Sequence, residues 1–162
     1  MADIAAQLLV ARPQPGLDAE LVHVGCLLHD IGVYRLAADE AYIRHGVLGE
    51  AILRAEDLPE ALCLIPSHHT GVGLTRRAII ARNLPLPHQD YLADTPEEAL
   101  VMYADKFHSK SNPPHFNTFN TYRAYVAQFD PENPTKFDAL ADQFGHPDLA
   151  PLAAKYGHLL NH

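Results

Sequence analysis

The segment Leu27-Leu28-His29-Asp30-Ile31-Gly32 ends the most apolar stretch of the sequence and holds an imidazole next to a carboxylate. The stretch predicts a helix over 18–30 that is apolar on all sides, which is typical of a helix in the middle of a domain. Burying both polar groups is costly unless something compensates them. A divalent metal ion is the simplest compensating partner, and a buried His–Asp hydrogen bond without metal is the alternative.

The rest of the sequence is also helical in pattern. Helices are predicted over 18–30, 46–55, 76–83, 118–129, 134–144 and 148–157, with further helices marked by Leu58, Leu62 and Ile65 and by the start Thr95-Pro96-Glu97-Glu98. We find no strand alternation and no internal repeat. The sequence therefore predicts an all-α, single-domain bundle of about eight helices. Residues 1–110 form its core, and residues 111–162 form a C-terminal helical extension packed on that core.

Length and composition narrow the class of function. The chain has 162 residues and a formal net charge of -8, which argues against a nucleic-acid polymer or a membrane surface as partner. No apolar run approaches the ~18 residues of a membrane span. The two cysteines, Cys26 and Cys63, lie in apolar surroundings, so we expect a reduced, cytoplasmic protein. Nucleophile elbows, phosphate-binding glycine loops and Cys-x-x-Cys pairs are missing from the sequence.

Histidine is unusually frequent, with 11 residues, and several histidines lie beside Asp or Gly. Three further candidates join His29 and Asp30: His45 at a helix start, His69 before a glycine loop, and Asp105 on a mostly apolar helix. Each one alone is readily structural, but a helical bundle can direct all five at one interior point. Imidazoles mixed with carboxylates suit one or two ions of Mn, Fe, Co, Ni or Zn, with Mg a further candidate.

These motifs together resemble a known family. The order of His29-Asp30-Ile31-Gly32, Arg44–Gly49, His69 with Gly71–Thr75, and Ala104-Asp105 resembles the HDIG form of the HD-domain superfamily of metal-dependent phosphohydrolases, over residues 1–110. The resemblance implies that His29, Asp30 and Asp105 hold a first ion, and that His45 and His69 hold a second ion bridged by Asp30. It also implies that a metal-activated hydroxide cleaves a phosphate ester or anhydride of a nucleotide or other small phosphorylated metabolite.

Other side chains near these motifs are candidates for catalysis and substrate binding. Asp30, Lys106 and His108 are the catalytic candidates, and His108 would protonate the leaving oxygen. Arg44, His68 and Lys110 are the candidates for substrate binding, because cations stabilise the extra charge of phosphoryl transfer. Weaker candidates for a lip around the substrate are Asn112, His115 and Asn117.

One departure from the family pattern leaves alternatives open. The pattern has a further histidine on the first helix, before a segment that Met1-Ala2-Asp3-Ile4-Ala5 resembles, and His23 lies on the wrong face to replace it. Either the natural start lies upstream, or the site is truncated and binds metal weakly. A regulatory or binding module with a degenerate metal site is therefore an alternative function, and a di-iron oxygenase is a second one. The tail is also a candidate dimer surface.

Overall fold

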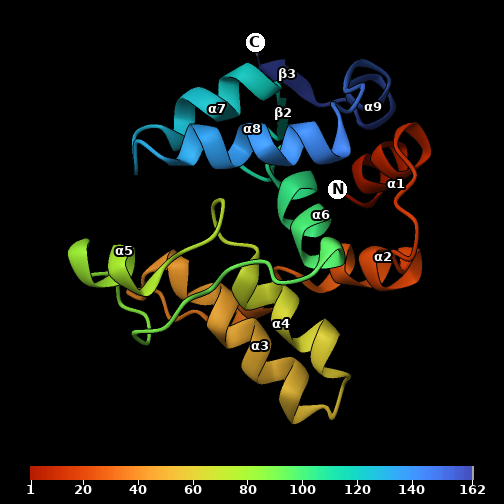
Figure 1. Cartoon of the computed structure of the whole chain (residues 1–162). Coiled ribbons are helices and arrows are strands. Elements are labelled where there is room, and N and C mark those ends of the chain that lie inside the picture. The colour runs from red at the N-terminus through yellow and green to blue at the C-terminus, as the bar shows by residue number, and fades with distance from the viewer. Residues whose placement is uncertain (162) are drawn as a thin grey trace.

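The computed structural model describes residues 1–161, and most of these residues are helical (Figure 1). The α-helices are α1 (Ala2–Ala11), α2 (Ala19–Leu28), α3 (His45–Ala55), α4 (Glu60–His68), α5 (Arg76–Ala81), α6 (Pro96–Asp105), α7 (Phe119–Val126), α8 (Asn133–Phe144) and α9 (Ala150–Tyr156). Two short 3-10 helices, η1 (Ile31–Arg35) and η2 (Tyr42–Arg44), connect α2 to α3. The predicted fold class, a single-domain helical bundle, is confirmed, with a small sheet added.

Side-chain caps set where several of the helices begin. The carboxylate of Asp18 accepts the N–H groups of Glu20 and Leu21 at 2.9 and 3.0 Å, and α2 follows it. Thr95 caps α6 in the same way, and Pro96 occupies the first turn of that helix. Such caps satisfy N–H groups that have no partner within the helix, so these starts could be predicted from the sequence.

A small sheet was not predicted. Strands β1 (His108–Ser109), β2 (His115–Asn117) and β3 (Leu159–Asn161) pair in the order β1-β2-β3, antiparallel and then parallel. Each strand has only two or three residues, which is too short for an alternating pattern to show in the sequence. The sheet joins the beginning of the C-terminal extension to its end.

The centre of the molecule is α6, whereas the sequence favoured the helix over 18–30. Leu100, Val101, Tyr103 and Ala104 of α6 are fully buried, while Leu27 of α2 is 65% exposed. The apolar residues of a helix predict that it is buried, but they do not predict which helix the other helices surround. Figure 1 shows α6 between a lower part, which carries α3, α4 and α5, and an upper part, which carries α7 and α8.

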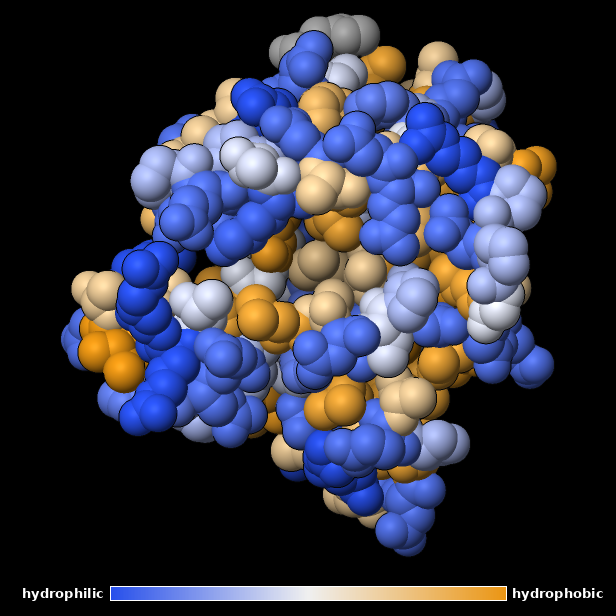
Figure 2. Space-filling view, viewed as in Figure 1, coloured by the Kyte–Doolittle hydropathy of each residue, from blue (hydrophilic) through white to orange (hydrophobic). Residues whose placement is uncertain are grey.

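Aromatic packing attaches the extension to α6. The buried ring of Phe137 lies 5.3 Å from the ring of Tyr103, and the ring of Phe144 lies 6.1 Å from it. These side chains belong to the same cluster of buried residues as Ile4 of α1. Figure 2 shows that the molecular surface is hollowed between the upper and lower parts. Every helix within residues 1–161 is too short or too polar to traverse a bilayer.

Candidate metal centre

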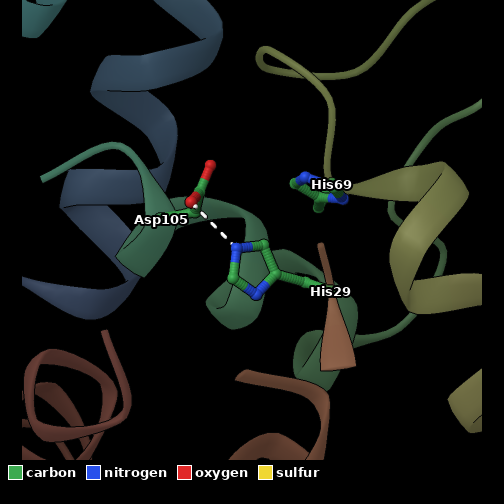
Figure 3. A group of neighbouring side chains, drawn as sticks. All are labelled: His29, His69 and Asp105. Atoms are coloured by element: carbon green, nitrogen blue, oxygen red, sulfur yellow. Dashed lines mark ion pairs between the residues drawn. The ribbon is translucent and has the colours of Figure 1, made fainter. Parts of the chain in front are cut away.

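The five candidate ligands lie at the ends of helices. His29 follows α2, His69 follows α4, His45 begins α3, and Asp105 ends α6; Asp30 precedes η1. Figure 3 shows His29, His69 and Asp105 directed toward one another from three separate helices. All except His29 line a cavity of about 800 Å³. The fold therefore brings together side chains that are up to 76 positions apart in the sequence, from His29 to Asp105.

Glycines allow the elements that carry these ligands to approach closely. A Cβ atom on Gly32 would lie only 2.0 Å from the backbone oxygen of His45. A Cβ atom on Gly46 would lie 2.6 Å from the backbone oxygen of Pro66. The contacts join η1 to α3 and α3 to α4, which is why a side chain at either glycine would push two ligand-bearing elements apart.

Backbone contacts fix the tautomer of all three histidines. Each Nδ1 lies within hydrogen-bond distance of the carbonyl oxygen three residues earlier: His29 with Cys26 (2.9 Å), His45 with Tyr42 (2.7 Å), and His69 with Pro66 (2.6 Å). A carbonyl oxygen only accepts, so each Nδ1 carries a proton and each neutral ring presents an Nε2 lone pair. This is the form in which histidine ligates metals, with its orientation set by the other nitrogen.

The lone pairs converge and need a cation between them. The Nε2 atoms of His45 and His69 are 3.1 Å apart, and neither can donate to the other when both carry a proton on Nδ1. Asp30 Oδ1 lies 3.4 Å from the first of these atoms and 3.5 Å from the second. Metal–nitrogen distances of ~2.0–2.1 Å allow two such nitrogens to share one ion. The residues present therefore fit a divalent metal ion.

A second group of ligand atoms lies beside the first. His29 Nε2 is 3.2 Å from Asp105 Oδ1 and 3.3 Å from Asp30 Oδ2. His29, His69 and Asp105 form one group with metal-ligating geometry, and Asp30, His45 and His69 form another. His69 belongs to both groups, and Asp30 contacts a histidine with each of its oxygens. The first group therefore contains His69 where the family resemblance implied Asp30, although Asp30 also lies beside His29.

The pKa shifts show where this centre favours positive charge. Burial lowers the pKa of His69 to about 4 and also lowers the pKa of His45, so both rings are neutral near pH 7. Burial acts in the same direction on His29, but Asp105 and Asp30 outweigh it and raise its pKa. Burial opposes ionisation of Asp105, yet neighbouring Lys106 and His29 hold its pKa well below the usual value.

Two lysines supply positive charge in this structure. Lys106 is 4% exposed, and its ammonium donates to Asp105 Oδ2 at 2.9 Å and to the carbonyl oxygen of His69 at 2.8 Å. The ammonium of Lys110 donates to His29 Nε2 at 2.7 Å, contacts Asp30, and lies 3.3 Å from Asp105 Oδ1. Lys106 holds two ligand-bearing segments together, whereas Lys110 reaches the ligands from an exposed hairpin.

Three other predicted site residues, His108, His68 and Arg44, do not join the ligand groups, and neither does His23, which the sequence did not favour. His108 lines the cavity, but its Nε2 lies 3.2 Å from His158 Nδ1, and burial lowers its pKa to about 4. His68 points elsewhere, because its Nδ1 donates to Glu98 at 2.8 Å. Arg44 pairs with Glu40 and does not line the cavity. His23 is exposed on α2 and belongs to neither ligand group.

Sequence reasoning missed several residues of the site. Thr70 and Ser109 line the same cavity, and the carbonyl acceptors of the three histidines were not singled out. Tyr122 and Tyr125 lie beside the centre and are spaced three residues apart on α7. That spacing puts both rings on one face of a predicted helix, which was the signal available in the sequence.

Comparison with known proteins agrees with the fold and the ligand motifs. The sequence matches the HD domain family over residues 1–110, and the chain therefore belongs to the HD-domain family. It is 42% identical to an uncharacterized protein of Methanocaldococcus jannaschii over 107 residues, which are 65% of this chain and 60% of that protein. It is 39% identical over 88 residues to a tRNA (cytidine(56)-2'-O)-methyltransferase of Picrophilus torridus, covering 54% of this chain and 24% of that enzyme. The chain thus matches less than two thirds of either relative.

Solved structures show the same fold at low sequence identity. The HD domain of the phosphodiesterase PgpH from L. monocytogenes superposes with a TM-score of 0.54 and 16% identity, covering 96% of this chain and 89% of that one. The same domain in complex with cyclic-di-AMP gives a TM-score of 0.50 and 17% identity, covering 99% and 90%. At this level of identity the likeness establishes the architecture of the chain and nothing finer.

Proposed function

We propose that this protein is a metal-dependent phosphohydrolase that cleaves a phosphate ester or anhydride of a nucleotide or other small phosphorylated metabolite. The observation that carries the proposal is the pair of Nε2 lone pairs of His45 and His69, which face each other at 3.1 Å beside Asp30. Family membership supports it, as does the phosphodiesterase built on the same fold that binds cyclic-di-AMP. The cavity is open enough to admit a small phosphorylated molecule.

Divalent ions held by His29, Asp30 and Asp105 and by His45, His69 and Asp30 would supply a Lewis acid and a water of lowered pKa. Asp30 orients both groups of ligands, because each of its oxygens contacts a different histidine. Lys106 keeps Asp105 ionised and ties it to the backbone of His69. Lys110, with a side chain that is 45% exposed, is the cation placed to contact a phosphate oxygen at the mouth of the cavity.

The proton donor that the sequence suggested needs revision. Burial lowers the pKa of His108 to about 4, so its ring is neutral near pH 7, and its Nε2 already contacts His158. We therefore assign His108 to the cavity wall in this proposal. We assign no substrate contact to His68 or Arg44, since Glu98 and Glu40 occupy their charged groups.

The test is phosphate release from a panel of nucleotides and other phosphorylated metabolites, with the protein loaded in turn with Mn, Fe, Co, Ni, Zn and Mg. We expect turnover with at least one metal, and we expect chelation to abolish it. Asp30→Asn should remove both turnover and bound metal, measured by elemental analysis. Asp39→Asn, an exposed carboxylate outside the centre, is the matched control and should behave as wild type. Metal binding without turnover on any compound would overturn the proposal.

A binding or regulatory module is the second candidate. It is favoured by the matches to segments that make up only 24% of two larger proteins, both tRNA (cytidine(56)-2'-O)-methyltransferases. A related segment therefore also occurs as a minor part of a protein that is named for another activity. This candidate predicts that metal and phosphorylated ligands bind to the centre and are recovered unchanged.

A further inference from the structure

A second cavity opens beside the metal centre, and the C-terminal extension builds most of its wall. It has a volume of about 430 Å³ and shares Asp105, Lys106, His108 and Ser109 with the cavity of the centre. Its other lining residues are His115, Asn117, Thr121, Tyr122 and Tyr125. We call this second cavity the extension chamber. The two cavities share four lining residues and therefore adjoin each other at the metal centre.

Two aromatic rings form one side of the extension chamber. The rings of Tyr122 and Tyr125 have centroids 5.6 Å apart and an interplanar angle of 51°. Tyr125 packs edge to face against Phe129, with centroids 5.1 Å apart, and is still 49% exposed, so part of its ring is accessible to a ligand. Packing against the buried ring of Phe137, 5.3 Å away, holds Tyr122 in place. Rings held in this way are the usual platform on which a planar ring stacks.

Three neutral polar side chains of the extension chamber are available to a ligand. Within residues 1–161, the side-chain amide of Asn117 and the hydroxyl groups of Tyr122 and Tyr125 make no hydrogen bond. The backbone N–H of Asn117 donates to Phe107, which fixes the position of the residue beside the chamber. An amide offers both donors and an acceptor, which allows it to pair with the edge of a base.

The charges of the chamber argue against a second phosphate. Lys106 is its one cationic side chain among the described residues, and its ammonium is already engaged by Asp105 and by the backbone of His69. Within residues 1–161, no arginine lines the chamber. The chamber therefore favours a neutral group over a second phosphate, and its two tyrosine rings favour a planar group.

We propose that the extension chamber holds the base of a nucleoside phosphate whose phosphate group lies at the metal centre. This inference rests on the proposed phosphohydrolase function and narrows its substrate class. Tyr125 stacks on the base, and Asn117 reads its edge. The HD core then performs the chemistry, and residues 115–125 of the extension select the substrate.

The test compares substrates with and without a base. Asn117→Ala and Tyr125→Ala should lower kcat/KM for nucleoside 5'-monophosphates by about 10-fold or more, the typical loss when a stacking or base-pairing side chain is removed. The same variants should leave kcat/KM for glycerol phosphate unchanged. Asn120→Ala, an exposed amide on α7 outside the chamber, and Tyr34→Ala, an exposed tyrosine on η1, are the matched controls. An equal loss on both kinds of substrate would overturn the inference.

A binding measurement separates failure of this inference from failure of the proposed function. Free nucleosides carry no phosphate, and their binding to the metal-loaded protein can be followed by saturation-transfer NMR. We expect nucleoside binding that Asn117→Ala and Tyr125→Ala abolish and that the two controls retain. Such binding without any turnover would leave the chamber assignment intact and refute the hydrolase. Turnover of glycerol phosphate without nucleoside binding would refute the chamber assignment alone.

Discussion

The core, residues 1–110, and the extension, residues 111–162, are built on different principles. In the core, backbone contacts orient the candidate metal ligands, because each of three histidine rings contacts the carbonyl oxygen three residues earlier. Gly32 and Gly46 let the elements that carry these ligands approach closely. In the extension, large aromatic rings such as Phe137 pack against α6 and leave polar groups free beside the centre. The family match also stops at residue 110. The core thus holds the candidate metal ligands, and the extension adds aromatic rings and polar side chains beside them.

The largest expected effect is the loss of turnover and bound metal when a candidate ligand of the core is replaced, in contrast to a replacement in the extension. Asp30→Asn should lower turnover roughly 1,000-fold on every substrate, on the scale of losing a catalytic group, because Asp30 contacts histidines in both ligand groups. Bound metal should fall as well. In the extension, Asn117→Ala should leave the metal content unchanged. Steady-state kinetics together with elemental analysis checks both results, and metal loss in the extension variant would contradict the division.

The next effect tests whether the extension folds as one unit with the core. Phe137 is fully buried against Tyr103, Phe107 and Phe119, so Phe137→Ala should cost about 3–5 kcal/mol of unfolding free energy. We expect a single thermal transition at a lower temperature. Phe129→Ala, which removes a half-exposed ring of the extension, should cost less than about 1 kcal/mol. Two separate transitions in calorimetry would show that the extension is a domain of its own.

A pair of glycine substitutions compares close backbone packing in the core with an open position in the extension. Gly32→Ala places a Cβ atom against backbone of α3, so we expect a loss of about 3 kcal/mol and reduced metal affinity. Gly157→Ala in the extension meets no atom within 4 Å, but φ there is +64°, and the loss should be about 1 kcal/mol. Chemical denaturation measures both losses. Similar losses at the two positions would contradict the close approach at Gly32.

The smallest expected effect concerns pH. Burial lowers the pKa of His68, but the contact with Glu98 outweighs burial and raises it above the usual 6.5. The stabilisation that the His68–Glu98 contact gives the folded protein is therefore fully present below pH 6.5. It is lost as the pH rises through the raised pKa of His68 in the folded protein. The free energy of unfolding of the chelated protein should decline over that range. Glu98→Gln should flatten the decline, and an unchanged pH profile in this variant would refute the assignment.

The ligand motifs could be predicted from the sequence because each one is local. His29-Asp30 at a helix end, His45 beside Gly46, and His69 before a glycine loop each contain the residues that shape their own backbone. The pairing of His68 with Glu98 could not be predicted, since the two are 30 positions apart and nothing local connects them. The sheet was missed for a related reason: β2 and β3 are too short to leave a pattern, and tertiary contact alone pairs them.

By itself, the sequence determined the helical class, the helix starts at Asp18 and Thr95, and the identity of the candidate ligands. These features depend on periodicity, capping and side-chain chemistry, which act over a few residues. Only the tertiary structure decided that α6 and not α2 is the centre, that His108 lies against His158, and that α7 lies next to the candidate metal ligands. These three placements depend on which surfaces meet when the whole chain buries its apolar side chains. A local sequence pattern does not determine those contacts.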